Sequence, residues 1–197
     1  SPSISGWTPT SCTSMSSMFS NAQTTAGGDF NQPIGSWDVS NVENMRQMFF
    51  NSIVFDQDLS NWDVGNVTNM EKLFAHSQSS LSAFNQDISG WNVGNVETMS
   101  DMFKFALGFN QDLGSWNVSG VTNMSQMFNG SGLNQANYDS ILTGWTGWDG
   151  TGATKTLQSN VSFGCSTCNY TSGGTVENAR NYLITGLTWT ITDAGGI

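Results

Sequence analysis

The sequence is poor in positive charge. Its 197 residues include five Lys and Arg and one His against fifteen Asp and Glu, which gives a formal net charge of −10. Proteins that bind nucleic acid present a basic surface to the phosphates, so we expect no nucleic-acid partner. Basic clusters that would bind an anionic lipid surface are missing as well.

Long hydrophobic runs are also missing. The sequence has no stretch of about 18 apolar residues that could cross a bilayer. It also has no basic segment followed by an apolar one, the pattern typical of a signal peptide. We therefore expect no membrane insertion of this segment. The chain begins at Ser1, which is compatible with a leader, an anchor or flanking domains in a longer precursor.

Cysteine is scarce, with three residues in the chain. Cys165 and Cys168 lie close together in FGCSTCNY, where Ser, Thr and Gly predict turns. A local disulfide is the favoured interpretation if the protein is exported, and free thiols come next. A zinc site would lack further ligands, and a redox motif would lack its strand-to-helix context.

The chain repeats one motif. FNQPIGSWDVSNVENMRQMF begins at Phe30, and close copies begin at Phe55, Phe84 and Phe109. Four Trp residues are separated by 25, 29 and 25 positions, namely Trp37, Trp62, Trp91 and Trp116. Trp7 heads a degenerate first copy, and all nine Met residues occupy two slots of the frame. Repetition at this period is typical of proteins built from stacked units.

The pattern inside one copy predicts the fold. Val42, Met45 and Phe49 have the spacing of one helical face, and Asn41 suits the N-cap of such a helix. The preceding WDV alternates apolar and polar residues, as a short strand does. We predict an α/β fold, a leucine-rich-repeat-like solenoid of about five stacked short strand–helix coils with a C-terminal α/β cap. The repeated Trp, Val, Met and Phe residues would fill the shared interior.

We expect one domain with two parts. Residues 1–132 form the repeats, five copies of which the first is degenerate, and residues 133–197 form the cap. Within the cap, Val176, Ala179 and Leu183 share a helical face. The segment LTWTIT is expected to be a last strand with Trp189 and Ile191 on one side.

The repeat resembles a known family. W-[DN]-V-x-N-V-x-[NT]-M-x-x-M-F, at residues 37–49, 91–103 and 116–128, is similar to the BspA-like leucine-rich-repeat surface proteins of bacteria. The resemblance spans residues 7–195, with departures such as Leu73 and Gly120. It implies a secreted or surface-anchored, non-catalytic module, linked in some relatives to adhesion. It implies no particular ligand and no catalytic residues.

Few residues are candidates for contact with a ligand. Trp145 and Trp148, in TGWTGWDGTG, lie outside the repeat frame and are therefore freer to meet one. Three basic residues that differ between copies are expected on one exposed face, namely Arg46, Lys72 and Lys104. An insertion at residues 76–83 would join that face. His76 within it is expected to be a solvated loop residue and a weak candidate for a general base.

An acidic column is a candidate metal site. Asp58, Asp87 and Asp112 occupy one slot of successive copies. Carboxylates about 4.8 Å apart repel one another unless backbone N–H groups or a cation relieve them. We favour turn capping, with calcium as the one cofactor considered, although no EF-hand spacing is present. The neighbouring Gln residues would form an amide ladder, namely Gln32, Gln57, Gln86 and Gln111.

The sequence favours a non-catalytic module of a secreted or cell-surface protein that binds a protein or glycan partner, as an adhesin does. The alternatives are a passive spacer in a larger surface protein and a carbohydrate-binding module. A glycan hydrolase is the least favoured class, since it would need two exposed carboxylates about 5–9.5 Å apart in a cleft. We expect no enzymatic activity.

Overall fold

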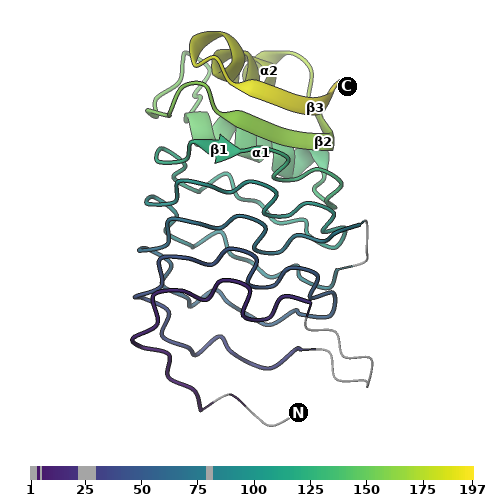
Figure 1. Ribbon diagram of the computed structural model, residues 1–197. Helices are drawn as coiled ribbons and strands as arrows, with labels where there is room; N and C mark the ends of the chain where they lie inside the picture. The colour runs from purple at the N-terminus through teal and green to yellow at the C-terminus, as the bar shows by residue number, and fades with distance from the viewer. Residues whose placement is uncertain (1–3, 5, 22–29, 79–81) are drawn as a thin grey trace.

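The computed structural model of the chain describes residues 4, 6–21, 30–78 and 82–197 (Figure 1). Its regular elements are β1 (Asn123–Met124), α1 (Gln135–Thr146), β2 (Ser162–Tyr170), α2 (Gly174–Asn181), the π-helix η1 (Tyr182–Gly186) and β3 (Thr190–Gly196). The strands form a parallel sheet in the order β1-β2-β3. In the described part of the chain, no helix is long and apolar enough to cross a membrane.

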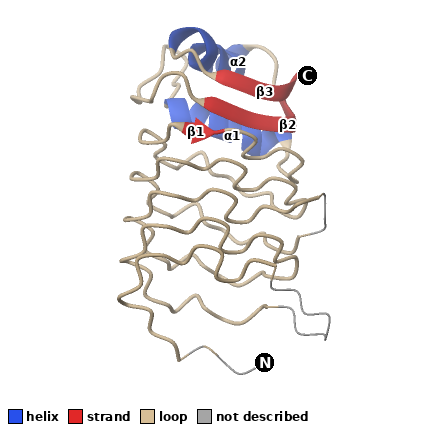
Figure 2. Cartoon of the chain, in the orientation of Figure 1, coloured by secondary structure: helices blue, strands red, loops and turns tan. Residues whose placement is uncertain are grey.

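The predicted fold class is wrong. We expected an α/β solenoid of about five strand–helix coils, but the described residues before β1 contain no helix and no strand (Figure 2). Among the residues that the structure describes, regular structure is limited to a small parallel sheet and the helices near it. Turns, not a helix, produce the spacing of Val42, Met45 and Phe49. Gln47 has a φ of 57°, in the left-handed region that interrupts a right-handed helix.

Backbone hydrogen bonds in the repeats run from one copy to the next. The N–H of Met45 donates to the carbonyl of Asn69 (2.9 Å), and the N–H of Gln47 donates to that of Glu71 (2.8 Å). Isolated parallel bridges join Ser14 to Asn44, Asn44 to Asn69, Asn69 to Thr98 and Thr98 to Asn123. Equivalent slots of successive copies therefore lie side by side, and the last of these slots is the start of β1.

The predicted burial of the repeated apolar residues is confirmed. Trp37, Trp62, Trp91 and Trp116 are at most 3% exposed. The repeated Val, Met and Phe residues of these copies are buried with them except Phe30, which is half-buried, whereas Trp7 and Met18 in the first copy are 57% and 37% exposed. The indole N–H groups donate to main-chain carbonyls of the preceding copy, Trp62 to Ile34 (3.1 Å), Trp91 to Leu59 (3.0 Å) and Trp116 to Ile88 (3.1 Å). Burial of the rings thus leaves these three N–H groups satisfied.

A row of asparagines also links the copies. Asn41 does not cap a helix, because none follows it. Its side-chain amide donates to the carbonyl of Thr10 at 2.7 Å. Asn66 donates in the same way to Ser40, and Asn95 to Gly65, each at 2.7 Å. The position that suggested a helix start is instead a hydrogen bond between neighbouring copies.

Helix α1 replaces the turns of a repeat. It begins after Asn134, whose side chain accepts a hydrogen bond from the N–H of Asn137, and it ends at Gly147, where φ is 62°. Near its end, the indole of Trp145 donates to the carbonyl of Leu113 at 2.8 Å. Trp62, Trp91 and Trp116 make the same bond, so Trp145 of α1 extends the column of buried repeat Trp residues although its backbone is helical.

The C-terminal part closes one end of the molecule (Figure 1). The expected helical face and last strand are found in α2, η1 and β3, with Ala179, Leu183 and Trp189 buried. Strand β2 was not expected, because its FGCSTCNY segment had predicted turns. It pairs with both β1 and β3 and so joins the repeats to the end of the chain.

Candidate functional site

The three candidate basic residues lie in one row of paired charges. Arg46 contacts Glu71 (Nε–Oε2, 3.2 Å), and Lys72 contacts Glu71 (Nζ–Oε1, 3.3 Å). Lys72 also approaches Asp101 at 4.0 Å, and Lys104 contacts the same carboxylate at 3.0 Å. The structure therefore brings Arg46, Lys72 and Lys104 together, as expected for residues on one face. Each of them is paired with an acid of this chain.

The charged side chains of this row interact mainly with one another. Partial burial acts to raise the pKa of Glu71, but hydrogen bonds from Arg46 and Lys72 outweigh it and hold the pKa below its usual value. Surface ion pairs of this kind contribute little stability individually. The two carboxylates offset two of the three cations, so the row offers only a weak field to a charged partner.

The two candidate aromatic residues have different positions. The prediction for Trp145 as a ligand contact is wrong, because its side chain is 0% exposed and belongs to the interior column. Trp148 is half-buried, and its ring lies 6.0 Å from that of Tyr182. Its indole N–H is buried and has no hydrogen-bond partner among the described residues. The spacing of 29 residues between Trp116 and Trp145, the same as between Trp62 and Trp91, was the signal that could have placed Trp145 in the column.

The acidic column consists of turn-capping carboxylates. One oxygen of Asp58 accepts from the N–H of Ser60 (2.8 Å), Asp87 from Ser89 (2.9 Å), and Asp112 from Gly114 (2.8 Å). Hydrogen bonds from the following Ser lower the pKa of Asp58 and of Asp87. In residues 6–21, 30–78 and 82–197, no group of three or more His, Cys, Asp or Glu side chains could hold a metal ion.

The glutamine column donates to neighbouring copies. Gln57 donates to the side chain of Asn31 (2.9 Å), while Gln86 and Gln111 each donate to both a carbonyl and a side-chain oxygen, of Asp56 and Asn85 respectively. The expected ladder is therefore not built from Gln alone. Each of these Gln side chains donates to the residue before the equivalent Gln of the preceding copy, which is Asn31, Asp56 or Asn85.

His76 differs from the expected solvated loop residue. It is only 5% exposed, and its backbone N–H donates to the carbonyl of Lys104 at 2.8 Å. Burial lowers its pKa to about 4, because the cationic form would lose its hydration. Residues 79–81 of the predicted insertion lie outside the described residues.

The cysteine pair lies in β2. Cys165 and Cys168 are joined by a disulfide, with their Cα atoms 5.3 Å apart. Both residues are buried and occupy a strand rather than the predicted turn. The strand register with β3 shifts between Cys165 and Asn169, so the disulfide lies at an irregularity of the sheet.

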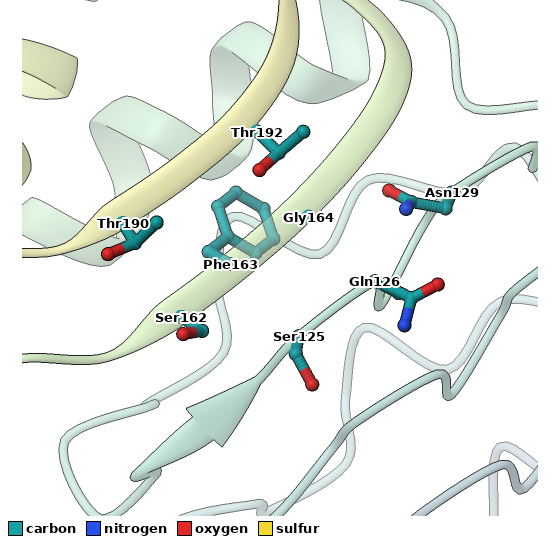
Figure 3. A pocket seen from close by; sticks show the side chains of 8 residues that line it. All are labelled: Ser125, Gln126, Asn129, Ser162, Phe163, Gly164, Thr190 and Thr192. Atoms are coloured by element: carbon teal, nitrogen blue, oxygen red, sulfur yellow. The ribbon is translucent and has the colours of Figure 1, made fainter.

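A small hollow lies on the sheet, at the junction of the last repeat and the C-terminal strands (Figure 3). Its volume is about 170 Å³. Ser125, Gln126 and Asn129 line it from the segment after β1. From the other side it is lined by β2 and β3, through Ser162, Phe163, Gly164, Thr190 and Thr192. All of its polar side chains are hydroxyls or amides, and none is ionisable.

Close packing of the backbone shapes this hollow. A Cβ atom on Gly164 would lie 2.6 Å from the backbone nitrogen of Gln126, so only glycine lets β2 approach that segment. The carbonyl of Gly164 accepts from the N–H of Phe128 at 2.8 Å, which holds the two sides of the hollow together. The ring of Phe163 is only 1% exposed and forms part of the core below.

Most of the lining side chains are free of protein partners. Asn129 accepts from the N–H of Ser166 at 2.8 Å. The other polar side chains make no hydrogen bond to a described residue, namely those of Ser125, Gln126, Ser162, Thr190 and Thr192. No pattern in the sequence marks this group, because its members are spread over nearly 70 positions and only the sheet brings them together.

Comparison with protein families identifies the repeat. The profile of the family described as "Mycoplasma protein of unknown function, DUF285" matches residues 1–80 and again residues 79–158. The chain belongs to this family. The two DUF285 matches confirm that the chain is a repeat protein, and they attach no function to the repeat. No curated protein and no solved structure matches the chain.

The DUF285 matches also place the hollow. Ser125, Gln126 and Asn129 lie inside the second matched segment, whereas the lining residues of β2 and β3 follow its end at residue 158. The hollow is therefore formed jointly by DUF285 repeat sequence and by the C-terminal segment that the family profile does not cover.

Proposed function

We propose that this DUF285 chain is a non-catalytic binding module of a secreted or cell-surface protein, related to the BspA-like proteins that its repeat resembles, and that it holds its partner at the hollow on the β1–β2–β3 sheet. The observation that carries the proposal is the group of five polar side chains around the hollow that have no hydrogen-bond partner among the described residues. Polar side chains that border a hollow and make no hydrogen bond within the protein are available to a ligand.

Three features support an extracellular binding role over catalysis. The Cys165–Cys168 disulfide is typical of proteins from oxidising compartments. The lining of the hollow holds no His, Cys, Asp, Glu or Lys that could act as a general acid, a base or a nucleophile. The carboxylates of the acidic column, for their part, accept hydrogen bonds from their own turns.

The proposal is tested with an array of glycans and extracellular-matrix proteins probed with the purified chain. We expect binding that is reduced when Thr190 and Thr192 are both replaced by Val. The matched control is Thr167→Val, an exposed position of β2 outside the hollow. Valine keeps the shape and the strand preference of threonine, so the fold should tolerate all three changes.

The passive spacer is the rival outcome. If the wild-type chain binds nothing across the array, a spacer fits the molecule better. If the Thr190→Val/Thr192→Val variant binds as well as the wild type, the chain binds its partner elsewhere and the hollow is not the binding site.

A further inference from the structure

We infer that the hollow takes one uncharged sugar residue, recognised through its hydroxyl groups. This inference rests on the proposed binding function and specifies the chemistry of its ligand. It follows from the kinds of side chain that line the hollow and from its size.

The lining has the hydrogen-bonding character of a sugar. A Ser or Thr hydroxyl both donates and accepts, and a Gln amide offers a donor and an acceptor side by side. Sugar hydroxyls have the same dual character. The four hydroxyls come from two sides, Ser125 on one and Ser162, Thr190 and Thr192 on the other, with Gln126 next to Ser125 (Figure 3).

The absence of ionisable groups from the lining points to a neutral ligand. A carboxylate, sulfate or phosphate in the hollow would lose hydration without gaining a cationic partner there. The net charge of −10 on the chain also opposes an anion. Uncharged hexoses meet this condition, whereas uronic and sialic acids do not.

An extended peptide is a poorer fit. Peptides that add to a sheet are bound through main-chain hydrogen bonds along an open strand edge. The hollow instead presents side chains on the face of the sheet, and β2 at its centre is paired on both sides. Side-chain hydroxyls on a sheet face match the scattered hydroxyls of a sugar better than the regular N–H and C=O groups of a peptide.

The size of the hollow limits the ligand to one residue. Its volume of about 170 Å³ is well below the roughly 300–1,000 Å³ of pockets that enclose drug-sized ligands. Because Phe163 is almost fully buried, no aromatic ring is available for stacking on the sugar. Binding would therefore depend on hydrogen bonds, and we expect a dissociation constant on the order of millimolar for a single residue.

The experiment is a titration of the ¹⁵N-labelled chain, followed by amide NMR shifts. The probes are methyl β-glucoside, methyl β-galactoside and methyl α-mannoside, with glucuronate as the charged control. At least one neutral glycoside should shift the amides of Ser125, Gly164 and Thr192 in a saturable way, and glucuronate should shift them much less. Thr192→Val and, separately, Ser162→Ala should each raise the dissociation constant about tenfold, while Thr167→Val leaves it unchanged.

The outcomes separate this inference from the proposed function. If no neutral glycoside shifts these amides while the array shows a protein partner that depends on Thr190 and Thr192, the sugar inference fails and the binding function stands. Equal shifts with glucuronate would overturn the requirement for a neutral ligand. If neither sugar nor protein binds, both proposals fail. Because Ser162→Ala is a small change at an exposed position, it keeps the test decisive if Thr192→Val disturbs the strand.

Discussion

Left-handed residues recur at one slot of every repeat. Five residues there have φ values between 55° and 58°, namely Ser17, Gln47, Lys72, Asp101 and Gln126. A side chain in this conformation costs about 1–2 kcal/mol relative to the right-handed regions, whereas glycine adopts it freely. At Gln47 this conformation accompanies contacts between copies, because the N–H groups of Gln47 and Phe49 donate to the carbonyls of Glu71 and Leu73 in the next copy.

Ser17 and Ser16 offer a matched test of this strain. Both side chains are exposed, and only Ser17 has a positive φ. We expect Ser17→Gly to raise the free energy of unfolding by about 0.5–1 kcal/mol and Ser16→Gly to lower it by a similar amount. Urea unfolding of the two variants measures the difference, and changes of the same sign would contradict the structural assignment.

His76 makes stability depend on pH. Its pKa of about 4 in the fold is below the value of 6.5 of an unfolded chain, so only the unfolded state binds a proton between these values. The contribution of the neutral His76 side chain to the free energy of unfolding is fully present above about pH 6.5 and is lost as the pH falls towards 4. The loss reaches up to about 3 kcal/mol, since one pKa unit corresponds to about 1.4 kcal/mol.

The measurement is urea unfolding of the wild type and of His76→Gln from pH 7 to pH 4. The carboxylates contribute equally to both proteins, so the difference between them isolates His76. We expect the variant to lose less stability over this interval. Parallel pH profiles would show that the imidazole titrates normally in the fold.

At the level of elements, the asparagine row holds neighbouring copies together. The amide of Asn66 donates to the carbonyl of Ser40. Asn66→Ala removes this bond and should lower stability by about 1 kcal/mol. Asn66→Asp should lower it further, because a carboxylate oxygen would then face the carbonyl oxygen.

Asn61 provides the control for this series. It is exposed, lies in the same copy and makes no side-chain hydrogen bond to a described residue. Asn61→Asp should therefore change stability by less than about 0.5 kcal/mol. If Asn61→Asp and Asn66→Asp had equal effects in thermal unfolding, added charge rather than the lost donor would be the cause.

The C-terminal elements are joined at Asp193. This carboxylate in β3 accepts from the Arg180 guanidinium of α2 (2.7 and 2.9 Å) and from the Tyr138 hydroxyl of α1 (2.9 Å). Asp193 is 3% exposed in its side chain, and Arg180 is 16% exposed. The hydrogen bonds that Arg180 donates to Asp193 raise the pKa of Arg180, and burial raises the pKa of Tyr138 well above its ordinary value.

Removing the carboxylate charge should be strongly destabilising. Asp193→Asn leaves the Arg180 cation buried without a counter-ion, and we expect a loss of about 3 kcal/mol. The double variant Asp193→Asn/Arg180→Met should recover part of this loss, since no unpaired charge remains. Chemical denaturation of the two proteins provides the comparison. No recovery in the double variant would mean that the loss comes from packing rather than from charge.

At the scale of the whole molecule, we expect stability to be independent of calcium. In the acidic column, one oxygen of each carboxylate already accepts a hydrogen bond from a backbone N–H group. The melting temperature should therefore be the same in calcium, in magnesium and in EDTA. A rise with calcium alone would reveal a site that binds the folded state.

The sequence predicts which repeated residues form the core better than it predicts the local backbone structure. The positions of Trp, Val, Met and Phe identify the core because they depend only on the repeat. The backbone between them was misassigned, since apolar spacing of three and four residues suits both a helix and the observed turns. Only the left-handed residue at Gln47 separates the two, and a glutamine gives no signal of that conformation.

The candidate site was the least predictable part. The sequence could place Arg46, Lys72 and Lys104 on one face because they lie in the corresponding region of successive copies of the repeat. The hollow could not be predicted, because Ser125, Ser162 and Thr192 meet only through the register of β1, β2 and β3. Strand β2 itself was hidden by residues that are more common in turns.

The phenylalanine pairs show where the chain tolerates a change of length. Phe49 and Phe55 are six positions apart with their rings at 4.1 Å, and Phe103 and Phe109 are six apart at 3.9 Å. Phe74 and Phe84 are ten positions apart, yet their rings also lie at 3.9 Å. Four extra residues have therefore entered this connection without displacing the interior, which makes it a permissive point for grafting a foreign peptide or an affinity tag.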